Sequence, residues 1–257
     1  MLSASVRAQL EYRASFFLES LGQFLVTGID FIGIWALFSR FGMIEGWRFE
    51  EVALLYGLVY VSFALAEASS TGFDSFSEIV SRGDFDRILA RPRSTILQLA
   101  GQQLSIRRTG KLLQGVVILI WALLALPISF SFSQYALLMF ALIGGYFLFY
   151  GLFIIQATFC FWTVQGIEVM NVLTYGGRET SQFPMSIYDK WLRRFFTMVV
   201  PVAGVSYYPV MTILGKSELT VLSRFLYSAS PMSGILFFFV ACIIWTFGVR
   251  RYRSTGS

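Results

Sequence analysis

The chain has 257 residues and a formal net charge of +5, because 20 lysines and arginines outweigh 15 acidic residues. Hydrophobic residues make up 56% of it and charged residues only 14%, whereas a soluble domain carries about 25% charge. Lipid must therefore solvate part of the surface, and basic residues between apolar blocks indicate membrane topology rather than nucleic-acid binding. The lack of histidine excludes His-based zinc sites, His–Ser triads and His proton relays.

The first segment, residues 1–19, is predicted to be an amphipathic helix that lies in the membrane interface before the first span. Apolar side chains fall near one helical face while the charged ones lie mostly elsewhere. A frayed extension of the first span is the alternative interpretation. The apolar positions are Leu2, Val6, Leu10 and Phe17.

Uncharged apolar runs predict six transmembrane helices in a single transmembrane domain over residues 1–257. The run from Leu112 to Ile167 is too long for one helix across about 30 Å of hydrocarbon, and the turn-like residues 127–134 divide it. The predicted spans are 20–40, 51–71, 111–129, 135–162, 195–214 and 231–249.

Lysine and arginine placement predicts the orientation of these spans. The segments outside the spans alternate between the two sides of the membrane. Sixteen lysines and arginines fall in the segments of one side and four in those of the other. The positive-inside rule then places both termini in the cytoplasm, which predicts an all-α membrane protein with two cytoplasmic ends. The richer set comprises 1–20, 72–111, 163–194 and 250–257.

The longest charged connection, residues 72–110, is predicted to present a short amphipathic helix. Asp84 can cap this helix, and it ends before Pro92 because the residue before a proline is biased out of the helical region. A helix this short is not stable alone in water and needs a surface on which to dock. The residues by themselves favour a partner protein and the lipid headgroups equally as that surface. Its apolar positions are Phe85, Ile88 and Leu89.

Two acidic residues fall inside predicted spans. Asp30 lies near the middle of the first, where a charge costs about 2.5–3.5 kcal/mol, so it is expected to face protein or water. The functional interpretation places Asp30 on a transport path or in a helix–helix contact. The structural interpretation is a protonated or hydrogen-bonded carboxyl group that only fixes helix packing. Glu67 lies nearer the cytoplasmic end of the second span and is expected to reach water, with a role on the transport path or in a helix contact as the alternative.

The segment before and within the fifth span contains several helix breakers. Gly176-Gly177 and Pro184 are expected to interrupt residues 164–194. Pro201 and Pro209 predict a kinked or discontinuous helix, which is tolerated only where protein or water can satisfy its backbone. A re-entrant piece within 204–230 and an ordinary kinked helix both remain open.

No motif predicts catalysis, a metal site or nucleotide binding. Gly215-Lys216-Ser217 resembles the end of a P-loop, but Val210 stands where that motif needs glycine. Cys160 and Cys242 lie in apolar runs without metal-ligand spacing. We therefore expect this chain not to be an enzyme and to bind no cofactor itself.

The layout resembles the ABC-2-type permease family, in particular a prokaryotic subgroup whose chains are about as long as this one. The interfacial helix and the six-span order match, and Arg82–Pro92 is similar to the subgroup's G-x-x-D-x-x-L-x-x-P segment. The stretch 183–193, followed by Val200-Pro201 and Tyr208-Pro209, resembles the second half of the subgroup. The resemblance covers essentially the whole chain.

The resemblance implies that the connection between spans two and three supplies a coupling helix, which seats in a groove on a separate ABC ATPase. It further implies two copies of that ATPase, which bind ATP and Mg, and a second permease chain, identical or homologous, with the substrate path between the two chains. The setting would be the inner membrane, the direction export, and no nucleic acid would be involved. Matching positions are Gly83, Asp86, Leu89 and Pro92; Asp84, Phe85 and Ile88 are neighbours added on physical grounds.

A stand-alone secondary transporter or channel is the alternative function. Such a protein is expected to carry more polar residues inside its spans and often an internal repeat. Asp30 and Glu67 are the only acidic residues in the interior of the predicted spans, since Glu51 stands at the first position of its span, and no clear repeat is visible. The composition therefore favours the permease subunit.

Overall fold

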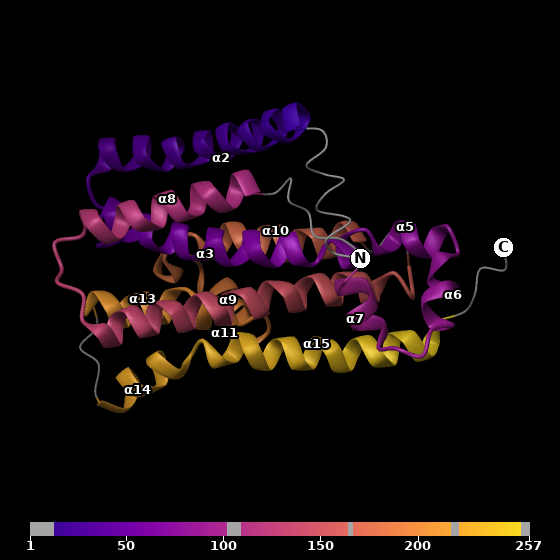
Figure 1. Cartoon of the computed structure of the whole chain (residues 1–257). Helices are drawn as coiled ribbons and strands as arrows, with labels where there is room; N and C mark the ends of the chain where they lie inside the picture. The colour runs from indigo at the N-terminus through magenta and orange to yellow at the C-terminus, as the bar shows by residue number, and fades with distance from the viewer. Residues whose placement is uncertain (1–12, 102–108, 164–166, 217–220, 253–257) are drawn as a thin grey trace.

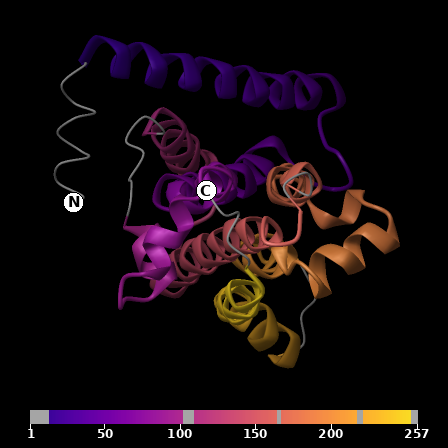
Figure 2. The same cartoon turned by 90° about the vertical axis from the view of Figure 1, so that its right-hand side faces the viewer.

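The apolar runs of the sequence fold into helices throughout the part of the chain that the computed structural model describes, residues 13–101, 109–163, 167–216 and 221–252. Within these ranges extended pairing is limited to one isolated bridge, between Ile44 and Trp47. The five longest helices make up the bundle. They are α2 (Arg13–Phe41), α3 (Phe49–Ser69), α8 (Thr109–Ala125), α9 (Phe132–Phe159) and α15 (Met232–Arg251). Helix α2 lies obliquely across the direction of α9 and α15 (Figure 1, Figure 2).

Four of the described helices are long and apolar enough to cross a membrane: Ser20–Phe41, Phe49–Ser69, Phe132–Phe159 and Met232–Arg251. A bent pair, Lys190–Met198 with Val202–Leu214, raises the number to five if it counts as one span. Helix α8 lies where the third span was predicted, and its 17 residues are at the lower end of the about 17–25 that a span needs. The chain is therefore a multi-pass helical protein, and the six-span count stays a prediction.

The first helix differs from the expected arrangement of an interfacial helix followed by a span. Residues 13–41 form the single continuous helix α2, so 13–19 lead directly into the span. Residues 1–12, the larger part of the predicted interfacial helix, lie outside the described residues. Helix α2 packs mainly on α8 and lies at the edge of the bundle (Figure 2).

Helix α3 forms the centre of the fold. It packs against α8, α9 and α10 (Ile167–Ser181), and its side chains from Val52 to Ala64 are almost all buried. Because α3 is enclosed on several sides, it is apolar around nearly its whole circumference, as expected of a buried helix.

Glycines bring α3 close to its neighbours. A Cβ atom added to Gly57 would lie 2.8 Å from the Cα atom of Leu119 on α8, and one added to Gly145 on α9 would lie 2.7 Å from the Oγ atom of Ser62. Small residues at helix contacts let backbones approach closely, which increases van der Waals packing where lipid offers no hydrophobic driving force. The same device joins α9 to α15, where Gly144 meets Pro231 and Gly234.

Helix α10 corrects the expectation that Gly176-Gly177 interrupts the segment between the fourth and fifth spans. The helix continues through both glycines to Ser181 and packs on α9 and α3. Its buried residues, Met170, Thr174, Gly177 and Ser181, follow helical spacing along one face. Thr174 Oγ1 donates a hydrogen bond of 3.1 Å to Gln156 Oε1 on α9, so a packed face outweighs the low helix propensity of two glycines.

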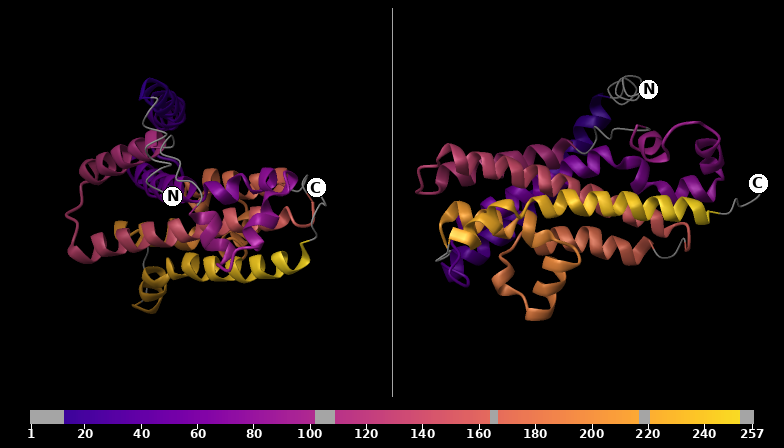
Figure 3. Two further views of the ribbon diagram at one scale, coloured as in Figure 1. Left: turned by 45° about the vertical axis from the view of Figure 1, so that its right-hand side comes forward. Right: turned by 90° about the horizontal axis from the view of Figure 1, so that it is seen from below.

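The expected discontinuity in the fifth predicted span is present. After η2 (Met185–Ile187), helix α11 (Lys190–Met198) ends before Pro201, and the chain resumes at an angle of 71° as α12 (Val202–Val205) and α13 (Tyr207–Leu214). Helix α14 (Val221–Ala229) then packs on α13, with the rings of Tyr208 and Tyr227 stacked at 4.5 Å. The two helices form a hairpin at the end of the bundle opposite α6 (Asp84–Leu89) (Figure 3).

Lys216 ties this hairpin to the turn between α2 and α3. Its Nζ atom donates a hydrogen bond of 2.5 Å to the carbonyl of Gly46, lies 2.6 Å from Glu51 Oε2, and sits 4.4 Å from the ring centroid of Trp47. The lysine that imitates a P-loop in the sequence therefore has a structural contact at this end.

The glycine packing generates a stability prediction. Gly57→Val should separate α3 from α8, because the added atoms meet backbone atoms of Leu119, and overpacking of this kind costs about 1–3 kcal/mol. Thermal unfolding of the purified chain in detergent should show a lower midpoint. The matched control is Gly22→Val on α2, where a Cβ meets nothing within 4 Å; an equal loss in both variants would contradict the packing role.

Candidate functional site

Four short helices form an elbow, residues 71–100, at one end of the molecule. They are α4 (Thr71–Asp74), α5 (Phe76–Ser81), α6 (Asp84–Leu89) and α7 (Thr95–Ala100). The elbow lies beside the last turns of α9 and α15 (Figure 1, Figure 3). It coincides with the connection in which the sequence predicts a coupling helix.

Helix α6 begins at a glycine because the chain reverses there. Gly83 has φ +73, a left-handed conformation that costs glycine little and other residues considerably more. Glycine at the first position of the family-like segment thus has a local reason: it turns the chain from α5 into α6.

Phe85 anchors α6 to the body of the protein. Its side chain is fully buried, and its ring centroid lies 5.0 Å from that of Phe76 on α5 and 4.9 Å from that of Tyr252 after α15. The rings of Phe161 and Trp245 complete the cluster at 5.5 and 6.3 Å. Aromatic pairs at these separations add about 0.5–1.5 kcal/mol each beyond their burial, so α6 is attached to α15 and to the turn that follows α9.

Two polar side chains fix the far side of the elbow. Gln98 Nε2 donates hydrogen bonds to the carbonyls of Ile88, at 3.1 Å, and Arg93, at 3.0 Å, which holds the end of α6 and the turn around Pro92. Trp245 Nε1 donates to Thr95 Oγ1 at 3.0 Å, which links α15 to the start of α7.

The outer face of α6 carries a different part of the predicted set. Leu89 is 39% exposed and Pro92 is exposed, whereas Phe85 and Ile88 are buried against the protein. Asp84 is exposed and pairs with Arg87 at 3.6 Å. The predicted docking residues therefore divide into an inward pair that holds the helix and an outward group that faces solvent.

Asp86 lies between these two groups, half-buried next to the aromatic cluster. Burial, together with the neighbouring Asp86 carboxylate, raises the pKa of Tyr252 above its ordinary value. The phenol therefore stays neutral at physiological pH and packs as an aromatic ring against Phe85.

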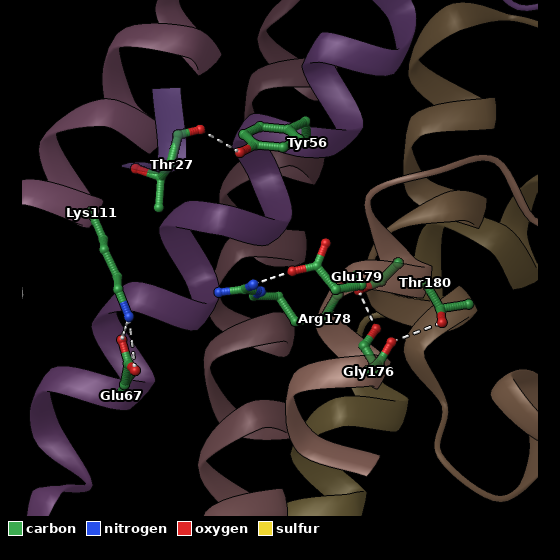
Figure 4. Close-up of polar contacts among 10 residues, drawn as sticks. Thr27, Tyr56, Glu67, Lys111, Gly176, Arg178, Glu179 and Thr180 are labelled. Carbon is green, nitrogen blue, oxygen red and sulfur yellow. Dashed lines mark hydrogen bonds and ion pairs between the residues drawn. The ribbon is translucent and has the colours of Figure 1, made fainter. Parts of the chain in front are cut away.

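Glu67 corrects the expectation that it reaches water. It is 2% exposed, and both of its carboxylate oxygens lie 3.1 Å from Lys111 Nζ on α8 (Figure 4). The pair bridges α3 and α8 inside the bundle. The sequence alone did not identify Lys111 as the partner. Two signals could have done so: a buried carboxylate requires a counter-charge, and Lys111 stands at the start of the next apolar run.

Arg178 is a second, largely buried charge that the sequence did not single out. It pairs with Glu179 on the same helix (Figure 4). Its guanidinium carbon lies 5.2 and 5.1 Å from the ring centroids of Tyr60 and Phe63 on α3. Cation–π contacts of this kind contribute about 0.5–2 kcal/mol, depending on how far the charge is desolvated. Arg178 therefore fastens α10 to α3.

Asp30, the other in-span acid, belongs to a different place. It lies on α2, is exposed, and borders a cavity between α2 and the segment around η2. Within the described ranges, no group of three or more His, Cys, Asp or Glu side chains could hold a metal ion.

These features define a class: a membrane protein of several apolar helices with a buttressed, solvent-facing elbow at one end. A family model described as ABC-2 family transporter protein matches residues 24–256, so the chain belongs to the ABC-2 transporter family. The predicted resemblance is thereby confirmed. No curated protein and no solved structure matches the chain.

Membership defines the chain as a membrane permease of an ABC transporter. A permease of this family is the membrane component and is not itself catalytic, and the family implies partnership with an ABC ATPase subunit.

The buried ion pair should be sensitive to loss of either partner. Glu67→Gln or Lys111→Met leaves one charge buried without its counter-charge, which costs about 3–5 kcal/mol, and the partial exposure of Lys111 favours the lower value. We expect a lower unfolding midpoint for each single variant. The double variant Glu67→Gln/Lys111→Met should lose less than the sum, and strict additivity would contradict the pairing.

The anchor role of Phe85 makes a separate prediction. Phe85→Ala removes a buried aromatic side chain at a cost of about 3–5 kcal/mol, so hydrogen exchange of residues 84–93 should accelerate. Leu89→Ala, on the outer face of the same helix, should leave the exchange near that of the parent chain. Unchanged protection in Phe85→Ala would show that the aromatic cluster does not hold α6.

Proposed function

We propose that this chain is the permease subunit of an ATP-driven exporter in the inner membrane. Two permease chains, identical or homologous, would enclose the substrate path, and two copies of a separate ATPase would bind ATP and Mg. The α6 end would face the cytoplasm, as the distribution of lysine and arginine predicts.

The observation that carries the proposal is the construction of the elbow. A coupling element must offer an outer surface for a partner and must also be rigid enough to pass movement on. Leu89 and Pro92 provide apolar contact at the outer face, and the Phe85 cluster connects the same helix to α15 and to the turn at the end of α9. Movement of α6 would therefore displace α15 and the end of α9.

The charges around α6 indicate the kind of surface that would receive it. Arginines surround the exposed apolar tip, so a groove with an apolar floor and acidic rims would complement it. The exposed arginines are Arg82, Arg87, Arg91 and Arg93.

The test is co-purification of the tagged full chain from its native host in mild detergent, with associated proteins identified by mass spectrometry. The parent chain should recover a soluble ATPase that carries a Walker motif. Leu89→Asp should reduce its recovery at least tenfold, because a charge would enter the apolar contact at a cost of about 1.4 kcal/mol or more.

The matched control is Leu97→Asp. Leu97 lies on α7 of the same elbow, is 72% exposed, and matches none of the family-like positions. The Leu97→Asp variant should recover the ATPase at a level near that of the parent chain. Equal recovery in the Leu89 and Leu97 variants would contradict docking through α6, and recovery of the chain alone would favour a stand-alone transporter or channel.

A further inference from the structure

A cavity of about 400 Å³ lies between α2, the turn that follows α2, and the segment around η2. Small-molecule sites have volumes of about 300–1,000 Å³, so the cavity can hold a compact organic molecule. It is separate from the elbow, and no part of the ATPase-docking proposal uses its residues.

The walls of the cavity are apolar except at one point. Aliphatic and aromatic side chains from three segments line it, and Asp30 is the only charged residue among the lining residues. A site that combines an apolar wall with one or a few polar groups selects ligands by the chemistry of those groups. The walls include Ile34, Phe38, Trp47, Phe183 and Ile187.

Asp30 makes no hydrogen bond or ion pair with any other residue in the described part of the chain, in contrast to Glu67, which is paired with Lys111. It lies in the middle of the candidate span Ser20–Phe41, where a charged side chain is costly unless water or a counter-charge compensates it. A carboxylate that has no hydrogen-bond or ion-pair partner among the described residues, and that borders an apolar cavity, favours a positively charged occupant with an apolar body.

We propose that this cavity binds amphiphilic cations, with the Asp30 carboxylate as the counter-ion. Two aromatic walls, Phe38 and Phe183, suit the same chemistry, because a ligand cation over an aromatic ring gains about 0.5–2 kcal/mol from the ring quadrupole. The ring of the third, Trp47, already has the Lys216 ammonium 4.4 Å from its centroid. An inorganic cation fits poorly, since Ca²⁺ and Mg²⁺ need about six or more oxygen ligands and this site has one carboxylate.

This proposal rests on the proposed function in one respect: if the chain is an exporter subunit, the bound cations are its transported substrates. Binding itself needs no ATPase, so it can be measured on the purified full chain reconstituted in nanodiscs. Tetraphenylphosphonium is the probe, and tetraphenylborate, which has the same shape and the opposite charge, is the matched ligand.

We expect saturable binding of tetraphenylphosphonium and at least tenfold weaker binding of tetraphenylborate. Asp30→Asn should weaken binding of the cation at least tenfold, which corresponds to about 1.4 kcal/mol. Asp30→Glu retains the charge and should stay within about threefold of the parent on the same scale. The charge-matched control is Asp189→Asn, an exposed acid that does not line the cavity.

A second variant tests the cavity without changing its charge. Ile34→Trp fills part of the volume and should also weaken binding of the cation, while size-exclusion profiles of all variants report whether they remain folded. No binding by the parent chain, equal binding of the two ions, or unchanged affinity in Asp30→Asn would overturn the proposal. Disruption of a dimer by Asp30→Asn with unchanged cation binding would assign the carboxylate to a subunit contact instead.

Failure here is distinguishable from failure of the exporter assignment. Cation binding that survives while no ATPase co-purifies would retain the site and remove the ATP-driven mechanism. ATPase recovery without cation binding would retain the transporter and exclude this substrate class.

Discussion

The fold depends on the close approach of α3 to the helices around it. Gly57 and Gly145 remove side-chain volume where α3 meets α8 and α9, and the remaining side chains of α3 are almost completely enclosed. Lipid offers no hydrophobic driving force between helices, so this close packing supplies cohesion by contact alone. The Glu67–Lys111 pair and the Arg178 contacts are possible because the same packing excludes water from the centre.

In the elbow, one short helix uses different residues to attach to the protein and to form its outer surface. A helix of six residues cannot hold its shape alone in water, yet α6 must keep its outer face available. Phe85 resolves this conflict by packing inward among aromatic rings from three other parts of the chain. The outward residues can then be chosen for contact with a partner without weakening the helix.

The sequence predicted the elements whose signals are local. The main apolar runs, the short helix before Pro92 and the break before Pro201 follow from composition, capping and proline chemistry. Which of these side chains pack against the protein and which face outward could not be predicted from local signals. Phe85, Ile88 and Leu89 read as one apolar set, and only the three-dimensional arrangement divides them.

The fate of the in-span acids has the same explanation. Asp30 and Glu67 look alike in the sequence, since each is a lone carboxylate in an apolar run. The difference arises from residues far along the chain, because Lys111 reaches one of them and an apolar cavity borders the other. The sequence likewise predicts a break at Gly176-Gly177, because it does not reveal the helical face that α10 buries against α3 and α9.

The contact of Lys216 with Gly46 and Glu51 has a consequence for the order of synthesis. The two ends of this tether are 170 residues apart, so α2 and α3 leave the ribosome long before the lysine is made. Until α13 arrives, the Glu51 carboxylate lacks this partner and the turn at Trp47 is without its cationic neighbour. That end of the bundle therefore cannot be completed before residue 216 has been synthesised.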